Sequence, residues 1–223
     1  MGARKVLVLG DSILKPILIN EENRYAISKS VNWTGLEKTL NVEIENKSKM
    51  GATIRHGLKL LNENIAMDKY FSVVIEFGGN DCSYDWAQVS QNKDVHLPKI
   101  SPEEYEQTLR EMISIVRQNN AKPILTTLPP ISAKRYYDWF LKELNQENIM
   151  HHLQDVEVIY RHQEGYSNIN QTVAAETQTE IVDIRKEFLL RKDFLTLICT
   201  DGSHPNAEGE QLIIEAFIKK YKQ

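Results

Sequence analysis

The sequence is poor in cysteine and in long apolar segments. Its 223 residues include only Cys82 and Cys199, too few for a disulfide framework or a cysteine-rich zinc site. Every apolar run is shorter than ten residues, whereas a membrane-spanning helix needs about 20. The residues before the first apolar segment are too few for a signal peptide. We therefore expect a cytoplasmic protein with no membrane span, whose cysteines are free thiols unless they bridge each other.

Excess basic charge and phosphate-binding glycine motifs are also missing. Lysine and arginine number 27 against 31 aspartate and glutamate residues, so the formal net charge is -4. Such a chain gives no electrostatic reason to expect nucleic acid or an anionic membrane as a partner. Neither Gly-x-Gly-x-x-Gly nor Gly-x-x-x-x-Gly-Lys occurs, which argues against a nucleotide-binding domain. The absence of Gly-x-Ser-x-Gly argues against the nucleophile elbow of α/β-hydrolases.

The sequence does contain a regular alternation of short β-rich segments and longer amphipathic ones. Apolar or alternating segments predict strands at 5–10, 42–47, 71–79, 122–130 and 180–184. Helices are predicted at 51–66, at 102–119, at 134–175 with breaks, and at 206–221. Strands separated by helices pair in parallel. We expect one domain over residues 1–223, a three-layer α/β/α sandwich with a flavodoxin-like parallel sheet of about five strands.

The triplet Gly10-Asp11-Ser12 ends the first predicted strand. Glycine, aspartate and serine are common in turns and helix caps, so a strand-to-helix turn is the simplest interpretation. In parallel α/β sheets, however, reactive groups gather at the carboxyl ends of the strands. A serine there acts as a nucleophile when other strand ends supply a base, a residue that orients the base, and donors for an oxyanion.

Two further segments carry suitable residues. Asn80 follows the third predicted strand, and its amide would lie beside Ser12 if the first and third strands are neighbours; an ordinary loop is the alternative. Near the C-terminus, two residues separate Asp201 from His204. At that spacing a carboxylate can bind the imidazole Nδ1–H and leave Nε2 as a base. The same pair could ligate a metal, but no third ligand has a suitable spacing, so we expect no metal and no cofactor.

Taken in order, four short segments resemble the sequence blocks of the SGNH (GDSL-like) hydrolase superfamily. They are Gly10-Asp11-Ser12, Gly51, Gly79-Asn80-Asp81 and Asp201-Gly202-Ser203-His204. Together they extend from residue 10 to residue 204, nearly the whole chain. The first block continues with isoleucine where the family has leucine, and the second lacks an earlier glycine often found there.

The resemblance implies a serine esterase. Ser12 would be the nucleophile, His204 the general base and then acid, and Asp201 the residue that orients His204. The oxyanion hole would consist of the backbone N–H groups of Ser12 and Gly51 and the side chain of Asn80. Supporting roles outside the chemistry would belong to Asp11, Gly79 and Asp81.

The substrate is less closely defined. The superfamily includes carbohydrate O-deacetylases, lysophospholipases, thioesterases and arylesterases. Two segments, 82–100 and 131–144, should border the site as a rim or a lid, and they offer Tyr84, Trp86, Arg135, Tyr136 and Trp139. Aromatic rings there would suit stacking on a sugar or lining an acyl pocket. Because nothing indicates a long apolar groove, we expect short-chain acyl esters, above all O-acetyl groups on a saccharide or another small molecule.

Three alternatives stay open at this point. The segment 131–144 could instead be an amphipathic helix that buries Tyr136, Phe140 and its leucines in the core. The adjacent His151 and His152 are expected on a solvated helix surface rather than in a metal site. The protein could also be a binding module that kept the fold and lost the chemistry, although all four side chains of the expected triad and oxyanion hole are present.

Overall fold

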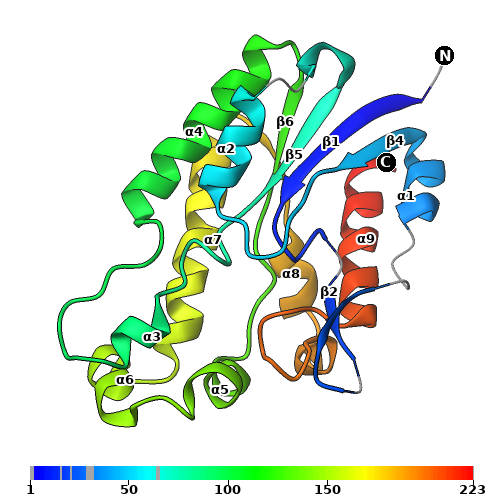
Figure 1. The fold of residues 1–223 in the computed structure, drawn as a ribbon. Helices are drawn as coiled ribbons and strands as arrows, with labels where there is room; N and C mark the ends of the chain where they lie inside the picture. Colours follow the sequence, from blue (N-terminus) through cyan, green and yellow to red (C-terminus); the bar gives the residue numbers. More distant parts are fainter. Residues whose placement is uncertain (1–2, 16, 21, 29–32, 64–65, 223) are drawn as a thin grey trace.

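The central sheet of the computed structural model has five parallel strands in the order β4-β1-β5-β6-β7 (Figure 1). The structure describes residues 3–15, 17–20, 22–28, 33–63 and 66–222. The strands are β1 (Arg4–Gly10), β4 (Val42–Asn46), β5 (Ser72–Glu76), β6 (Lys122–Thr126) and β7 (Glu180–Val182). All five predicted strands are present, and the first and third pair directly, as in flavodoxin-like sheets.

Two strands, β5 and β6, end three or more residues earlier than the sequence predicts. β5 ends at Glu76 because the chain turns at Gly78, whose φ is 130° and whose added Cβ would lie 2.8 Å from Leu128. β6 ends at Thr126, and the N–H of Leu128 donates to Ser167 Oγ (3.1 Å) instead of to a neighbouring strand. Both strands therefore continue into loops at the carboxyl edge of the sheet.

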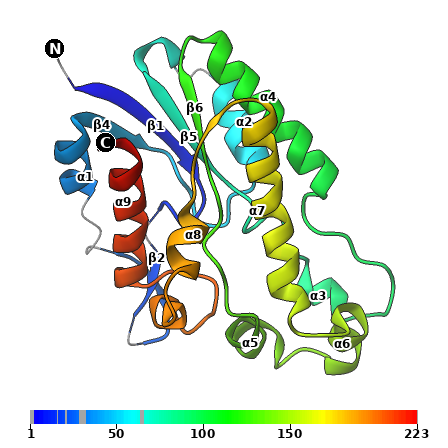
Figure 2. The same ribbon diagram turned by 180° about the vertical axis from the view of Figure 1, so that it is seen from behind.

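Helices cover both faces of the sheet (Figures 1 and 2). Alternate residues of β1 face the two layers, since Leu7 and Leu9 join one buried core and Val8 the other. The first face carries α2 (Ile54–Asn62), α4 (Pro102–Gln118) and α7 (Val158–Glu176). The opposite face carries α1 (Trp33–Leu40), α8 (Ile184–Leu189) and α9 (Ala207–Tyr221). This arrangement is the predicted three-layer sandwich.

Helices occur at the predicted positions, but several differ from the prediction in length. α4 begins as predicted, with Ser101 Oγ accepting the N–H of Glu104 (3.2 Å). α2 is shorter than the predicted 51–66, of which residues 64–65 lie outside the described part of the chain. The predicted segment 134–175 contains α5 (Ala133–Tyr136), a π-helical turn (Tyr137–Leu141), α6 (Gln146–Leu153) and α7. The short helices α1, α3 (Trp86–Val89) and α8 were not predicted.

Two further units lie beyond the carboxyl ends of the strands, in the lower part of Figure 1. α3, α5 and α6 pack around a separate apolar cluster that includes Val89, Ile131, Leu141 and Ile149. An antiparallel hairpin of β2 (Ile17–Ile19) and β3 (Tyr25–Ile27), which was not predicted, follows β1. Within the described ranges, no helix has both the length and the apolar character that crossing a bilayer requires.

Gly57 shows how closely α2 packs on the core. A Cβ at this position would lie 2.5 Å from a ring carbon of Phe77. Gly57→Ala should therefore lower the free energy of unfolding by about 1–3 kcal/mol, despite the higher helix propensity of alanine. The matched control is Gly165 of α7, whose Cβ would meet nothing within 4 Å, so that Gly165→Ala should raise stability by about 0.5–1 kcal/mol. Urea unfolding measures both; equal stability of Gly57→Ala and the wild type would contradict this packing.

Candidate active site

Ser12 lies in the turn that follows β1, at the carboxyl end of the sheet. Gly10, the last residue of β1, pairs with Glu76, the last residue of β5. The turn is fixed by Asp11, whose Oδ1 accepts the N–H of Ile13 (2.9 Å). The chain then continues into β2 and not into a helix. The interpretation of this triplet as a strand-to-helix turn is therefore wrong.

Asp201 and His204 lie in a tight loop whose ends are bridged by Ile198 and Pro205. Gly202 makes the loop possible, because its φ is 76° and a Cβ there would lie 2.5 Å from the backbone nitrogen of Tyr136. Inside the loop, the backbone N–H groups of residues 203 and 204 donate to Asp201 Oδ1 at 3.0 and 3.1 Å. The loop thereby fixes the carboxylate and the imidazole relative to each other.

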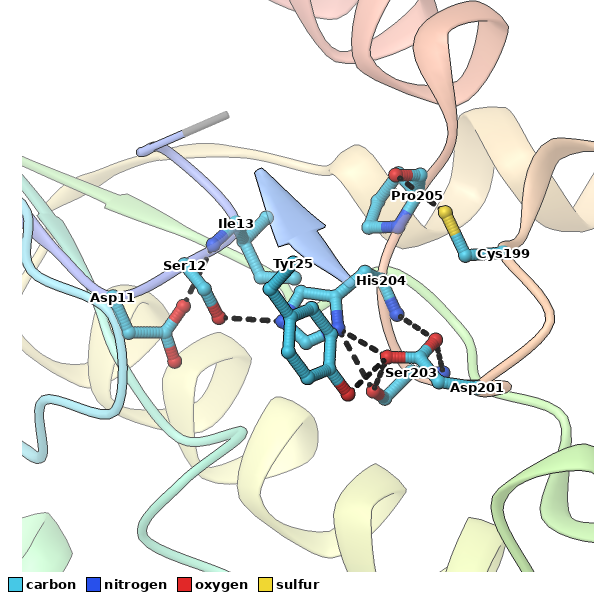
Figure 3. Close-up of polar contacts among 9 residues, drawn as sticks. All are labelled: Asp11, Ser12, Ile13, Tyr25, Cys199, Asp201, Ser203, His204 and Pro205. Atoms are coloured by element: carbon cyan, nitrogen blue, oxygen red, sulfur yellow. Dashed lines mark hydrogen bonds and ion pairs between the residues drawn. The ribbon is translucent and has the colours of Figure 1, made fainter. Parts of the chain in front are cut away.

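These side chains and Ser12 form one hydrogen-bonded chain (Figure 3). Asp201 Oδ2 lies 2.5 Å from His204 Nδ1, and His204 Nε2 lies 2.9 Å from Ser12 Oγ. Burial acts to raise the pKa of Asp201, but the hydrogen bond and charge of His204 outweigh it, so this pKa lies below its usual value. A charged Asp201 accepts the Nδ1–H of His204, which leaves Nε2 as the acceptor for the hydroxyl of Ser12.

Gly51 and Asn80 lie around the same serine. The loop that carries Gly51 is tied to β1 by the N–H of Lys49, which donates to Gly10 O (3.0 Å). Asn80 Nδ2 donates to Asp11 Oδ2 (2.9 Å), and the second N–H of this amide is available for another acceptor. One pocket of about 360 Å³ is lined by the predicted site residues Asp11, Ser12, Gly51, Gly79, Asn80 and His204.

A buried glutamate lies beneath this group. Glu76 is fully buried, and its Oε2 accepts the backbone N–H of Asp11 (3.1 Å). Burial, and next the charge of Asp11, raise the pKa of Glu76 well above its usual value. Burial also raises the pKa of Asp11, while hydrogen bonds from Asn80 and Glu76 act to lower it. Glu76 thus holds the backbone of Asp11, and the side chain of Asp11 in turn accepts the amide of Asn80.

Asp81 connects the loop after β5 to α2. Its Oδ1 accepts the N–H of Ile54 (2.8 Å), the first residue of α2, and its Oδ2 accepts the N–H of Gly78 (2.9 Å). Burial raises the pKa of Asp81 to about 7. The side chain therefore connects the loop that carries Asn80 to the start of α2, and within the described residues none of its hydrogen bonds goes to Ser12 or His204.

The two aromatic segments contribute unequally to the pocket. Tyr84, Trp86 and Tyr136 line it, and Trp86 Nε1 donates to Tyr136 Oη (3.0 Å). Arg135 lies elsewhere, with Nη1 bound to the carbonyl oxygens of Leu195 (2.7 Å) and Ile198 (2.8 Å). Trp139 is not among the lining residues and lies beside Tyr25.

Segment 131–144 packs partly into the apolar core and also borders the pocket. Leu141 is fully buried, as the amphipathic-helix alternative predicted, whereas Phe140 is 37% exposed and lines the pocket. Nearby in α6, His151 is exposed as expected, but His152 packs against the rings of Tyr84 (4.5 Å between centroids) and Trp86 (6.1 Å). Cys82 and Cys199 are both free and buried.

Two residues of the site, Glu76 and Tyr25, were not identified from the sequence. Glu76 is the one charged residue in the otherwise apolar segment that forms β5, and that exception was a usable signal. Tyr25 also lines the pocket, and its hydroxyl donates to Asp201 Oδ2 (3.1 Å). No sequence signal marked Tyr25, because it lies in a polar segment with neither helical nor strand periodicity.

Comparison with known proteins identifies the family of this chain. A model of the GDSL-like lipase/acylhydrolase family matches residues 8–212, and the chain belongs to this family. It is 24% identical to thioesterase 1/protease 1/lysophospholipase L1 of Escherichia coli (strain K12), over 98% of this chain and 84% of that protein.

Solved structures show the same fold. A lipase/acylhydrolase from Enterococcus faecalis superposes with a TM-score of 0.70 at 22% identity, over 98% of this chain and 95% of the other. An acetylxylan esterase from Geobacillus stearothermophilus gives a TM-score of 0.67 at 22% identity, over 99% and 95%. The protein is therefore a hydrolase of the esterase and acylhydrolase class.

The buried carboxyl groups should make stability depend on pH. The pKa of Asp81 rises from 3.8 to about 7 on folding, and that of Glu76 also rises. Raised carboxyl pKa values give stability that is complete below the unfolded pKa and is lost as the pH rises through the folded value. The melting temperature should therefore fall between pH 4 and 8, and fall less in Glu76→Gln, whose amide mimics the protonated acid.

The control for this measurement is Glu103→Gln, which changes an exposed glutamate in the first turn of α4. Its melting curve should follow the pH dependence of the wild type. Parallel pH dependences of the wild type and Glu76→Gln would show that Glu76 does not hold a proton in the folded protein.

Proposed function

We propose that this protein is a serine esterase in which Ser12 attacks the ester carbonyl. In this mechanism His204 Nε2 takes the proton of Ser12 Oγ as the new C–O bond forms. Asp201 keeps Nδ1 protonated and stabilises the imidazolium. The backbone N–H groups of Ser12 and Gly51 and the amide of Asn80 bind the oxyanion. His204 then gives its proton to the departing alkoxide, which leaves an acyl-Ser12 ester.

Water completes the reaction. His204 Nε2 removes a proton from a water molecule, whose oxygen attacks the acyl carbon; the bond to Ser12 Oγ breaks, and His204 returns the proton to Ser12. The products are a carboxylic acid and an alcohol. Each proton moves through His204, so the protein's own residues suffice for ester hydrolysis.

The observation that carries the proposal is the unbroken chain from Asp201 through His204 to Ser12, with separations of 2.5 and 2.9 Å. A nucleophile and a base within hydrogen-bond reach, with the base held by a third group, are the geometric signature of an activated serine. The acetylxylan esterase from Geobacillus stearothermophilus adds support. Its catalytic mutants replace a serine, an aspartate, and a histidine three positions after that aspartate, the spacing of Asp201 and His204.

For the substrate we propose a short acyl ester, above all an O-acetyl group carried by a saccharide. Aromatic rings suit the face of a sugar, and Tyr84, Trp86 and Tyr136 line the pocket beside Ser12. The similarity of fold to an acetylxylan esterase is consistent with this assignment. The sugar would occupy the aromatic part of the pocket, and the acetyl group would lie against Ser12.

A medium-length acyl chain is the second candidate, and the apolar side chains of the pocket favour it. The lining residues include Leu128, Ile131, Leu153 and Ile159, and a volume of about 360 Å³ is more than an acetyl group fills. The relative from Escherichia coli, a thioesterase and lysophospholipase, is consistent with this alternative. In that case the apolar side chains would hold the acyl chain and the alcohol would face solvent.

A series of p-nitrophenyl esters from acetate to decanoate decides between the two candidates. If the acyl group is short, kcat/KM should be highest for acetate and fall with chain length; a maximum near hexanoate or octanoate would assign the pocket to the acyl chain. Ser12→Ala should lose activity by more than about 1000-fold on every ester, since the nucleophile is gone. Unchanged activity in Ser12→Ala, or no ester hydrolysis by the wild type, would contradict the mechanism, and the latter would favour a binding module.

Asn80 tests the oxyanion hole separately. Asn80→Ala should lower kcat by about 100- to 1000-fold with a small change in KM, because the lost donor acts mainly in the transition state. Asn148→Ala is the matched control: this amide donates to Ser90 O (2.9 Å), away from Ser12, and its loss should leave kcat unchanged. A kcat for Asn80→Ala within about threefold of the wild type would remove Asn80 from the oxyanion hole.

A further inference from the structure

The β2–β3 hairpin brings a tyrosine to the candidate active site. Tyr25 is the first residue of β3 and pairs with Ile19, the last residue of β2. The turn between them is closed by Asn20, whose N–H donates to Arg24 O (3.0 Å) and whose Oδ1 accepts the N–H of Arg24 (2.9 Å). The hairpin thus holds Tyr25 by backbone pairing, on an element separate from the loop that carries Asp201 and His204.

Tyr25 contacts both partners of the Asp201–His204 pair (Figure 3). Its hydroxyl donates to Asp201 Oδ2 (3.1 Å), the oxygen that also lies 2.5 Å from His204 Nδ1. Its ring packs edge-on against the imidazole of His204, with 5.3 Å between the ring centroids. Burial, and next the charge of Asp201, raise the pKa of Tyr25, so the hydroxyl remains a donor at any physiological pH.

The other donors to Asp201 come from its own loop. Oδ1 accepts the backbone N–H groups of Ser203 and His204, and Oδ2 accepts Ser203 Oγ (3.0 Å) besides His204. Within the described residues, Tyr25 is the one donor to this carboxylate from a different element of the fold. This bond therefore connects the loop of Asp201 and His204 to the hairpin that follows the turn of Ser12.

We propose that Tyr25 is a positioning residue for the catalytic pair: it holds the carboxylate of Asp201 through its hydroxyl and the imidazole of His204 through its ring. The inference rests on the proposed function of these two residues. The hydroxyl takes up part of the negative charge of Asp201, and this weakens the attraction between Asp201 and the imidazolium. His204 is consequently a base that releases its proton more readily to the leaving alkoxide.

The sign of the expected change follows from this charge sharing. Without the hydroxyl, Asp201 presents more negative charge to His204, so the imidazolium keeps its proton to a higher pH. Among the described residues, the other ionisable groups that act on His204 are Asp11 after β1 and Glu210 on α9, whose own pKa values depend in part on His204. Replacing Tyr25 by phenylalanine changes neither of them and retains the packing ring.

The experiment compares Tyr25→Phe with the wild type by NMR titration of the His204 ring protons and by the pH profile of kcat/KM. In Tyr25→Phe the His204 titration midpoint and the acid limb of the profile should both move upward by about 0.5 pH unit. kcat should fall about two- to tenfold with KM little changed, as expected for one lost hydrogen bond. Assignment of the His204 signals comes from their loss in His204→Gln.

The matched control is Tyr221→Phe. Tyr221 also donates to a carboxylate, Glu180 Oε2 (2.9 Å), but it lies at the C-terminal end of α9 beside β7. This variant should leave the His204 midpoint and the acid limb where they are in the wild type. A similar shift in both variants would show a general effect of losing a tyrosine hydroxyl that binds a carboxylate and would overturn the proposal.

The two readouts separate failure of this proposal from failure of the proposed function. An active wild type with identical His204 midpoints in Tyr25→Phe and wild type would leave the esterase intact and refute a positioning role for Tyr25. An inactive wild type would contradict the esterase, while the NMR titration would still show whether Tyr25 acts on His204. A lower kcat without any shift in pH would indicate a purely structural role and would also refute the proposal.

Discussion

The pairing of β1 with β5 is the constraint on which the rest of the site depends. It ends with Gly10 opposite Glu76, and a Cβ on Gly10 would lie only 2.8 Å from Glu76 Oε2. Glycine at this position therefore allows a buried carboxyl group to reach the first residue of the turn that holds Ser12. Beyond these residues the two segments of the chain separate, one leading to Ser12 and the other to Asn80. Asp11 connects the two segments, because its side chain accepts a hydrogen bond from the Asn80 amide.

The buried acids explain how so small a region keeps its shape. Carboxyl groups in an apolar environment favour the protonated form, and a protonated acid can donate to a neighbouring carboxylate. Glu76 Oε2 accepts the backbone N–H of Asp11, and Asp11 Oδ2 accepts the amide of Asn80, so these three residues form one connected series. On the other side of the pocket, the charged Asp201 is held by backbone donors of its own loop and by Tyr25. Ser12 thus lies between two carboxyl groups whose pKa values are raised, Glu76 and Asp11, and the carboxylate of Asp201, whose pKa is lowered.

Much of this arrangement was predictable, because the relevant signals are local. Strands buried on both faces read as continuous apolar segments, and turn residues after them mark the carboxyl ends where Ser12 and Asn80 lie. Asp201 and His204 were predictable from their spacing within one turn. The position of Tyr25 was not predictable, because the contact of the β2–β3 hairpin with His204 forms only in the folded protein and has no local signal in the sequence. Arg135 illustrates the opposite case: a charged residue near the pocket in sequence binds the backbone of another loop instead.

The substrate pocket is the part that the sequence defined least. Its wall comes from α3, α5, α6 and the start of α7, elements whose side chains meet only after the chain has folded. Phe140 and Leu141 are neighbours in the sequence, yet one faces the pocket and the other the apolar cluster beneath it. Periodicity alone could not assign them, because the π-helical turn at Tyr137–Leu141 changes the faces that an α-helix would present.

The most direct test of the central claim is to label the folded protein with a fluorophosphonate ester and to measure its mass before and after proteolysis. Such a reagent forms a bond to an activated serine oxygen and releases fluoride, so it reports the nucleophile without requiring knowledge of the substrate. We expect a single adduct, located on Ser12 and absent from the heat-unfolded protein. No adduct on the folded protein, or an adduct on Ser203 in place of Ser12, would contradict it.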